Sequence, residues 1–477
     1  MRMARNGKRD RANGARRRER VDVQLPRFHS DGTIDVQAGG RQITVASGIP
    51  TETVRLALSG SGKHWRGEVI AVLDPAPERA TPACPVVDSC GGCEWQHLNH
   101  DGQLKHKAAI VRRLLSAQRL PTRIDEIVPM PDPWRYRVRA QIALGPSAGF
   151  RELRSKRIVR LNRCPVVHPR ISWLLEQLNR LLKLGELPDF GGKLLLHVQI
   201  VGSERERRLQ LLLEGTDGLR LNGPEPIRST AAVLAGLRDV DSVSWTDGAG
   251  HVEALHGSIF SEIEVGQHRY IVPAGSFFQS NLQLLPRLLD RINDLSRLDG
   301  TQHIADIYGG IGLLGLSVAE RVQQLTIIEI DPIATEAGER TAALRELVNV
   351  RFVAAPAEDA VLMLLALERV IVDPPRTGLD RQVVETISTL QPDIILYVSC
   401  NPATFARDAA ALRERGRGVQ RQDRQGRQSA GGQLAQGWRH RHRAHERASV
   451  QCAILHRQHA IWPHAQSLGC VAHAGRL

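Results

Sequence analysis

The 477-residue sequence is poor in aromatic side chains, poor in cysteine and free of long apolar runs. Phe, Trp and Tyr make up only 4% of the residues, which argues against a recognition surface built mainly from aromatic rings. No window approaches 18 consecutive apolar residues, so we expect no membrane span. Seven cysteines are too few for a disulfide scaffold, and the Arg-rich N-terminus is not followed by the apolar run of a signal peptide. These absences favour a cytoplasmic protein.

The positive charge of the chain is confined to its two ends. The formal net charge is +13, to which residues 1–20 contribute +7 and residues 409–477 contribute +9, leaving −3 for residues 21–408. A basic chain usually indicates a nucleic-acid partner. Because the charge is confined to the two tails, the overall charge is weak evidence for such a partner. Residues 1–20 are predicted to be a disordered basic arm, either a solvated tail or an RNA tether.

Composition and periodicity divide the rest of the chain into three predicted domains. Residues 21–75 contain five short period-two segments separated by Gly-rich turns, which is typical of a small, OB-like β-barrel. Residues 76–265 mix strands with helices and form a central α+β domain. Residues 266–408 alternate strands, Gly-rich turns and helices, which predicts an α/β fold with a doubly wound, Rossmann-like parallel sheet.

Four cysteines are spaced as metal ligands. Cys84, Cys90 and Cys93 follow a C-x5-C-x2-C pattern, and Cys164 lies 71 residues further on. Four thiolates suit zinc or an iron–sulphur cluster, and spacing does not separate the two. The alternative is a set of unrelated free cysteines.

A glycine-rich turn follows the first predicted strand of the doubly wound sheet. The stretch 303–316 ends its strand near Asp306 and continues through Tyr308-Gly-Gly-Ile-Gly312 into a helix. The next strand ends in Glu329, about 20 positions after the turn. A carboxylate there can accept hydrogen bonds from both ribose hydroxyls of S-adenosylmethionine or NAD. The alternative is a surface charge at a strand end.

Two further strand ends carry candidate chemistry. Asp373 is followed by Pro-Pro-Arg376, a rigid turn that can hold a carboxylate against a ligand. Cys400 follows the next strand and precedes Asn-Pro402. A cysteine there is either a buried small apolar residue or a nucleophile in the ligand crevice.

Together these motifs resemble the RNA uracil-5-methyltransferase family. The resemblance rests on the cysteine pattern, Phe277-Phe-Gln279-Ser-Asn281, the glycine-rich turn, Asp373-Pro-Pro-Arg376 and Ser399-Cys-Asn-Pro402, in that order. Cysteines ahead of the sheet domain point to the iron–sulphur branch acting on 23S ribosomal RNA. Transfer RNA is the alternative substrate. The sequence indicates no membrane partner and no obligatory protein partner.

The resemblance implies specific cofactors and site residues. It implies a TRAM-type RNA-binding barrel at the start and a [4Fe-4S] cluster on Cys84, Cys90, Cys93 and Cys164. It implies S-adenosylmethionine as methyl donor, bound by Gln279, Tyr308, Glu329 and Asp373, and Cys400 as nucleophile.

Residues 409–477 depart from the family pattern. They contain twelve Arg, nine Gln and seven His but no Lys, Asn, Thr, Tyr, Phe or Met. The family's general-base Glu and two last strands are not recognisable there, and Glu446 is the one weak candidate for the base. Such a composition is typical of a GC-rich gene read out of frame, with the switch near Arg413–Val419. The alternative is a genuine basic RNA-binding extension. If the general base is missing, the alternative function is that of a catalytically impaired RNA-binding relative.

Overall fold

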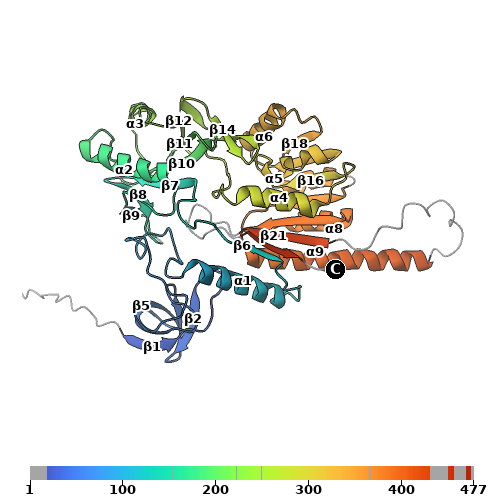
Figure 1. Cartoon of the computed structure of the whole chain (residues 1–477), viewed down its shortest axis with the longest axis horizontal. Coiled ribbons are helices and arrows are strands. Elements are labelled where there is room, and N and C mark those ends of the chain that lie inside the picture. Colours follow the sequence, from blue (N-terminus) through green and yellow to red (C-terminus); the bar gives the residue numbers. More distant parts are fainter. Residues whose placement is uncertain are drawn as a thin grey trace, which may run out of the picture. The chain divides into compact units, whose positions relative to one another are not determined.

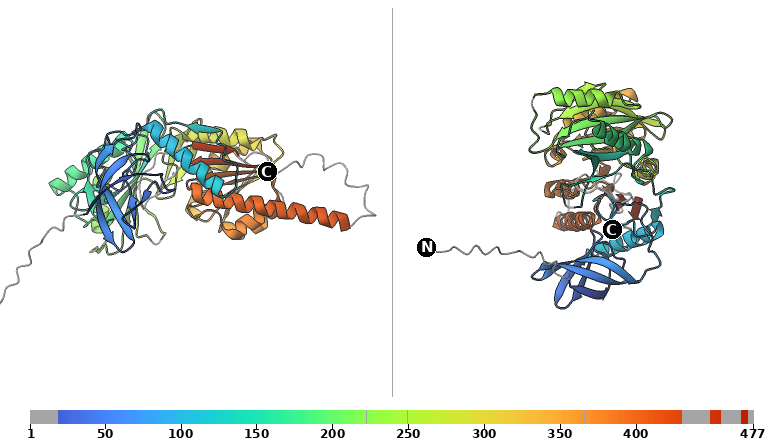
Figure 2. Two further views of the ribbon diagram at one scale, coloured as in Figure 1. Left: turned by 90° about the horizontal axis from the view of Figure 1, so that it is seen from below. Right: turned by 90° about the vertical axis from the view of Figure 1, so that its left-hand side faces the viewer.

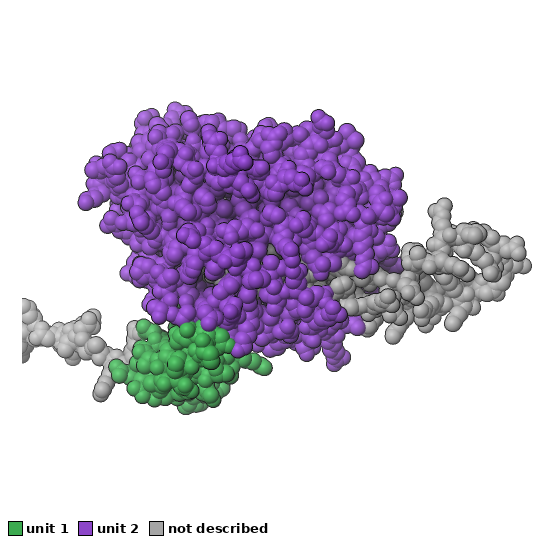
Figure 3. All heavy atoms as spheres, in the orientation of Figure 1, with its two compact units in different colours: residues 1–79 green, residues 80–477 purple. Residues whose placement is uncertain are grey.

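A computed structural model describes residues 19–153, 155–221, 223–248, 250–364, 367–429, 449–455 and 469–473. The chain forms two compact units, the first ending at Arg79 and the second beginning at Ala80 (Figure 3). The predicted basic arm lies outside the described residues up to residue 18, and its last residue, Arg20, already begins a strand. None of the described helices is both long and apolar enough to cross a membrane.

The first unit contains the five predicted strands, hydrogen-bonded in the order β1-β4-β5-β3-β2. Their bounds are β1 Arg20–Gln24, β2 Ile34–Ala38, β3 Arg41–Val45, β4 Thr53–Ser61 and β5 His64–Asp74. Alternate residues of β4 turn inward, and Val54 and Leu56 are fully buried. Closure of this sheet into a barrel stays a prediction.

A buried ion pair lies at the end of the first unit. Glu52 is fully buried, and its carboxylate accepts hydrogen bonds from Arg79 at 2.5 and 2.7 Å and from the backbone N–H of Ile49 at 2.9 Å. Burial opposes ionisation of this carboxyl group, but the hydrogen bonds outweigh it and hold the pKa of Glu52 below its usual range.

The second unit contains a mixed sheet built from strands between residues 139 and 273. Seven strands follow the order β13-β12-β11-β10-β7-β8-β9, and β14 joins β10 as part of a hairpin with β15. The bounds are β7 Arg139–Leu144, β8 Ala148–Arg151, β9 Ile158–Arg160, β10 Leu194–Gly202, β11 Arg207–Gly215, β12 Val240–Thr246, β13 Glu253–His256, β14 Phe260–Val265 and β15 His268–Pro273.

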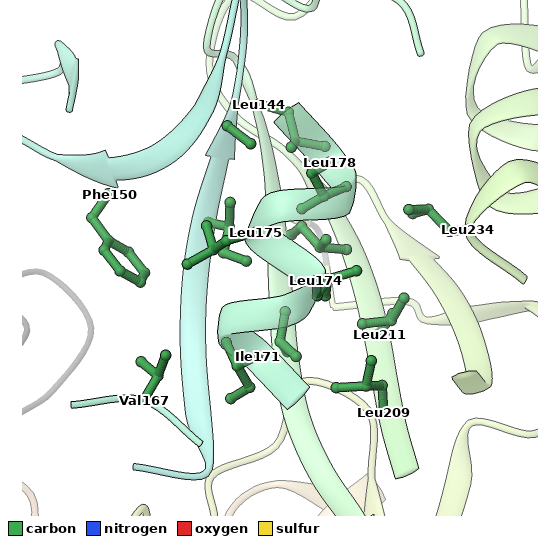
Figure 4. Packing of buried hydrophobic residues seen from close by; sticks show 14 of the residues in the cluster. Leu144, Phe150, Val167, Ile171, Leu174, Leu175, Leu178, Leu209, Leu211 and Leu234 are labelled. Atoms are coloured by element: carbon green, nitrogen blue, oxygen red, sulfur yellow. The ribbon is translucent and has the colours of Figure 1, made fainter. Parts of the chain in front are cut away.

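Helix α2 (Pro169–Leu184) packs its apolar stripe on this sheet, and α3 (Glu225–Ala235) covers β12 and β13. Ile171, Leu174, Leu175 and Leu178 recur at helical spacing and share one core with Leu209 and Leu211 of β11 (Figure 4). Gly185 ends α2 in the left-handed conformation with φ +74°. This core fixes the sheet that precedes the Rossmann-like layer.

The Rossmann-like sheet has eight strands in the order β18-β17-β16-β19-β20-β21-β22-β6 (Figure 1). It is parallel from β18 to β21, whereas β22 and β6 are antiparallel to their neighbours. The bounds are β6 Glu126–Val128, β16 His303–Ile307, β17 Gln324–Glu329, β18 Val350–Ala354, β19 Arg369–Val372, β20 Ile394–Ser399, β21 Ser449–Leu455 and β22 Gly469–His473. The strand order reverses between β16 and β19, which places a ligand crevice at their carboxyl ends.

Helices cover both faces of this sheet (Figures 1 and 2). One core holds residues of α4, α5 and α6, and the other holds residues of α1, α7, α8 and α9. The bounds are α1 His100–Ala117, α4 Leu285–Ser296, α5 Leu313–Leu316, α6 Pro332–Leu344, α7 Ala357–Ala360, α8 Arg381–Leu390 and α9 Pro402–Ser429; 3-10 turns lie at Ala319–Arg321 and Val361–Met363. The doubly wound α/β prediction is confirmed.

The expectation that residues 409–477 contain no strand of the sheet is wrong. Strand β21 pairs with β20, and β22 pairs with β21 and with β6. The composition of the tail gives no sign of these strands. Their hydrogen-bond partners are supplied by the edge of the sheet beside β20, which the local sequence does not reveal. The switch point predicted near Arg413–Val419 lies inside α9.

Candidate donor site and cysteine nucleophile

The glycine-rich turn between β16 and α5 lies directly against β17. Tyr308, Gly310 and Gly312 have φ values of +64°, +58° and +82°, so three residues of the turn adopt left-handed backbone conformations. A Cβ atom on Gly309 would come within 2.5 Å of Ile327 Cγ2. Such a backbone can approach a ligand closely, and its geometry explains why glycine recurs here.

Glu329 holds this turn from the end of β17. Its Oε2 accepts a hydrogen bond from Gly310 N at 2.8 Å, and its Oε1 accepts one from Asp331 N at 2.9 Å. Each carboxylate oxygen keeps a further lone pair for a ligand hydroxyl. The geometry therefore suits a residue that binds ribose hydroxyls and shapes the turn at once.

Asp306, which sequence reasoning gave no role, is fully buried beneath the same turn. Its Oδ2 accepts a hydrogen bond from Gly315 N at 2.8 Å. Burial raises the pKa of Asp306 to about 7, and Asp373 and Glu329 add to the rise. The signal that could have found it is an acidic residue within the apolar strand 303–307.

Tyr308 follows β16, and its phenol points to the start of α8. The backbone N–H of Asp380 donates to its hydroxyl oxygen, and burial raises the pKa of Tyr308. Asp380 in turn caps α8 by accepting from Gln382 N at 2.7 Å. The turn is thereby tied to a helix on the opposite face of the sheet.

Asp373 and Cys400 follow the adjacent strands β19 and β20. Val372 pairs with Tyr397, so both residues lie at the carboxyl edge of the sheet. Cys400 is buried, and Asn401 behind it caps α9 by accepting a hydrogen bond from Ala403 N at 3.1 Å. The Asn401 amide also donates to Arg376 O at 3.1 Å, which joins the Asp373-Pro-Pro-Arg376 turn to the cysteine loop.

The loop behind Cys400 packs on a buried acid that the sequence did not single out. Asp408 accepts hydrogen bonds from the Tyr397 hydroxyl and from Leu379 N, both at 2.7 Å. A Cβ atom on Gly378 would lie 2.4 Å from Asp408 Oδ2. This contact fixes the Asp373 turn against α9.

Gln279 lies in a segment that is anchored at both ends. Ser276 donates to Asp331 Oδ2 at 3.1 Å, beyond the end of β17. Arg139 donates to Phe278 O at 3.2 Å and stacks over the Phe277 ring at 5.5 Å, and beyond Gln279 the backbone N–H of Val138 donates to Ser280 O at 3.0 Å. The segment therefore runs from the Glu329 strand end towards the central sheet.

The four predicted ligand cysteines are free thiols that interact electrostatically. Burial raises the pKa of Cys90 to about 11, with further contributions from Cys164 and Cys84. Burial also raises the pKa of Cys93 and of Cys164. Four neighbouring thiols fit a metal centre chemically. Within the residues that the structure describes, however, no three His, Cys, Asp or Glu side chains are arranged to hold a metal ion.

The cysteine loop itself is tightly held. Gly91 donates to Arg151 O at 3.0 Å, and a Cβ atom there would lie 3.1 Å from Leu153 Cα. A Cβ atom at this position would require the neighbouring backbone to shift by a few tenths of an ångström, so glycine is favoured where the loop approaches the end of β8. Glu446, the candidate base, lies outside the described residues.

Comparisons with known proteins agree with this geometry. The tRNA (uracil-5-)-methyltransferase family model matches residues 258–421. An uncharacterized RNA methyltransferase of Gloeobacter violaceus is 30% identical over 397 residues, covering 78% of this chain and 85% of that protein. Another, from Halalkalibacterium halodurans, is 27% identical over 421 residues, covering 83% of this chain and 91% of that protein.

A solved structure shares the fold. The crystal structure of Pyrococcus abyssi tRNA (uracil-54, C5)-methyltransferase in complex with S-adenosyl-L-homocysteine superposes with a TM-score of 0.67. The two chains are 22% identical, and the match covers 94% of this chain and 99% of that one.

Proposed function

The chain belongs to the RNA (uracil-5-)-methyltransferase family and is an S-adenosylmethionine-dependent enzyme, and from this premise we propose that it methylates carbon 5 of a uridine in 23S ribosomal RNA through a covalent Cys400–uracil bond. The observation that carries the proposal is the position of Cys400, one strand away from Asp373 and at the same sheet edge as the glycine-rich turn. A donor and a thiol placed there would meet the same base.

Within this site, four residues would bind the donor. Glu329 and the glycine-rich turn would hold the nucleoside part, and Gln279, Tyr308 and Asp373 would border it. Bound S-adenosylmethionine would supply an electrophilic methyl group on its sulphonium. The uridine has to leave any base stack to reach this edge.

The thiol is required because carbon 5 of uracil is a weak nucleophile. Addition of the Cys400 thiolate to carbon 6 moves the C5–C6 electron pair to the ring as an enolate, which is nucleophilic at carbon 5. Carbon 5 then takes the methyl group and leaves the donor as a thioether. Removal of the carbon-5 proton by a general base restores the double bond and expels the thiolate. Glu446 is the candidate for that base.

Labelled methyl transfer tests the substrate and the mechanism together. With unmodified 23S rRNA and unmodified tRNA offered separately, 5-methyluridine should form in 23S rRNA, and Cys400→Ser should abolish it. RNA carrying 5-fluorouridine should trap the wild type covalently and leave Cys400→Ser free. Label in tRNA alone would make tRNA the substrate. Donor and RNA binding without turnover would identify a catalytically impaired relative.

We further propose a [4Fe-4S] cluster on Cys84, Cys90, Cys93 and Cys164. Support comes from four free thiols. Burial and the neighbouring cysteines raise the pKa of Cys90, Cys93 and Cys164, and the backbone wraps tightly at Gly91. Anaerobically purified protein should be brown, absorb near 400 nm and contain iron and acid-labile sulphide. A colourless protein that contains zinc would show that the four cysteines bind zinc, the alternative metal, in place of an iron–sulphur cluster.

We propose that the five strands of the first unit form a TRAM-like RNA-binding barrel. Support for a closed sheet comes from contacts between β1 and β2, the two end strands of the order, and from the burial of Ile34, Ile43 and Leu56. The full chain should bind rRNA more tightly than a variant in which Arg66 and Lys63 on this unit are changed to Glu. Equal affinities would contradict an RNA-binding role for this surface.

A further inference from the structure

One buried carboxylate, that of Asp408 in α9, is hydrogen-bonded to two separate segments of the proposed active site. Its Oδ2 accepts two hydrogen bonds of 2.7 Å, one from the Tyr397 hydroxyl and one from Leu379 N. Tyr397 lies on β20, three residues before Cys400, and Leu379 lies six residues after Asp373 in the loop that follows β19. The oxygen atom that holds one segment therefore also holds the other.

The surroundings leave this carboxylate little freedom to move. Asp408 is only 2% exposed, and Tyr397 is fully buried with its ring edge-on to Phe405 of α9, at 5.1 Å between centroids. Gly378 brings its backbone so close that a Cβ atom would lie 2.4 Å from Asp408 Oδ2. The loop after β19 thus meets Asp408 with backbone atoms, and no flexible side chain lies between them.

Two further hydrogen bonds join this loop to the start of α9, but both are open to water. Arg407 Nη2 donates to Thr377 O at 2.8 Å, and the Arg407 side chain is 54% exposed. The Asn401 amide donates to Arg376 O at 3.1 Å, also at the surface. Hydrogen bonds to a buried charged group are worth more than exposed ones, because water does not compete for the buried group. Asp408 is therefore the main link between the two segments.

We infer that Asp408 is a positioning residue for methyl transfer, which holds Cys400 and the Asp373 loop at the separation that lets thiol and donor act on one base. This inference rests on the proposed function. The thiol would add to carbon 6 while the methyl group is delivered to the adjacent carbon 5, so a small relative shift of the two segments affects both bonds. A misplacement of about 1 Å can cost about 100-fold in rate. Asp408 acts through Tyr397 and Leu379 rather than on the base.

Two substitutions loosen this link with little change of shape. In Asp408→Asn the amide has one acceptor oxygen, so either Tyr397 and Leu379 lose their acceptor or an NH₂ group faces Arg407 Nε, which donates to Oδ1 at 2.7 Å. Tyr397→Phe removes one hydroxyl and keeps the contact with Phe405.

Asp393→Asn is the matched control. It makes the same exchange just before β20 begins, at the sheet edge opposite Cys400, and it weakens a pair in which Arg369 donates to Asp393 Oδ2 at 2.8 Å. The control therefore disturbs the same strand without touching the link at Asp408.

Trapping of the full chain by RNA that carries 5-fluorouridine tests the inference, with saturating S-adenosylmethionine and the RNA, 23S rRNA or tRNA, that traps the wild type. Fluorine replaces the carbon-5 proton, so the thiolate cannot be expelled and the adduct accumulates. The end point counts the folded molecules, whereas the rate reports how well Cys400 is placed. Asp408→Asn should be trapped about 10- to 100-fold more slowly and Tyr397→Phe about 3- to 10-fold more slowly, both to the wild-type end point. Asp393→Asn should match the wild type, and isothermal titration should show unchanged donor affinity in all three variants.

Each outcome decides the matter. Wild-type trapping rates in both Asp408→Asn and Tyr397→Phe, or lower end points at unchanged rates, overturn the inference, while trapping of the wild type keeps the proposed covalent mechanism intact. Failure of the wild type to form an adduct with either RNA overturns that mechanism and the inference with it. Should Asp408→Asn not fold, the rate and end point of Tyr397→Phe give the answer.

Discussion

The carboxylate of Glu329 and the backbone N–H of Gly310 are joined by a hydrogen bond of 2.8 Å, across the gap between two parallel strands. Gly310 lies in the left-handed region, with φ +58°. The residue proposed to bind the donor ribose thus also sets the shape of the loop that approaches the donor. Binding and local order should therefore respond together to its substitution.

Glu329→Gln should weaken S-adenosylmethionine binding about tenfold, or about 1.4 kcal/mol. A glutamine offers one acceptor oxygen, so one of the N–H groups of Gly310 and Asp331 faces an NH₂ group instead. Isothermal titration measures the affinity. Glu336→Gln, on the exposed face of α6, is the control. Unchanged donor affinity in Glu329→Gln would remove this residue from the donor site.

Gly378→Ala should destabilise the second unit by about 2–3 kcal/mol, because its φ is +85° and the new Cβ meets Arg407 and Asp408 at 2.4 Å. Gly416→Ala is the control: this glycine lies within α9 with nothing within 4 Å, so alanine should stabilise by about 0.5–1 kcal/mol. Denaturant unfolding measures both. Opposite signs are the expected result, and equal stabilities would contradict the packing described at Gly378.

Arg79→Ala should destabilise the first unit by about 2 kcal/mol, because it leaves the buried Glu52 carboxylate without its cation. Arg55→Ala breaks the exposed pair with Asp22 and should leave stability unchanged. Hydrogen exchange of peptides from residues 20–74 in the full chain reports the difference. Equal protection in the two variants would count against the buried pair.

The same pair gives the first unit a defined sensitivity to acid. The pKa of Glu52 is lowered in the folded state, so its contribution to stability is fully present above its ordinary value of 4.5. That contribution is lost as the pH falls through the lower, folded-state value. Exchange protection of residues 20–74 should therefore decline below about pH 4.5 in the wild type, and less steeply in Arg79→Ala.

Cys93→Ser should remove the iron, the sulphide and the absorbance near 400 nm, because the proposed cluster on four thiolates would lose one ligand. Cys400→Ser is the control, since it changes a cysteine at the other sheet and should leave the metal content unchanged. Equal iron content in the wild type and in Cys93→Ser would exclude this cysteine as a ligand.

Resequencing the gene across codons 413–419 tests whether the tail is read in the correct frame. A shifted frame would restore a family-like ending with a recognisable general base after α9. An unbroken frame in independent isolates would make the Arg/Gln/His-rich tail authentic and leave Glu446 as the candidate. The family match ends at residue 421, close to the predicted switch.

Most of the donor site could be predicted from the sequence because its chemistry is local. Each of Glu329, Asp373 and Cys400 ends a strand with a clear apolar pattern, and parallel strands bring their carboxyl ends to one edge. The five strands of the first unit were predicted for the same reason, since period two is visible within five or six residues. The tail strands were missed because sheet edges, rather than local pattern, decide their pairing.

The sequence by itself determined the family, the α/β fold class and the candidate nucleophile, because those depend on short motifs whose order along the chain is specific. Only the tertiary structure decided how these motifs act on one another. It placed Asp306 beneath the glycine-rich turn, where Oδ1 has no hydrogen-bond partner among the described residues, and it joined Glu329 to Gly310 and Asn401 to Arg376. Such contacts link residues 19 to 25 positions apart, and burial and hydrogen-bond geometry at that range are properties of the packed chain rather than of any local segment.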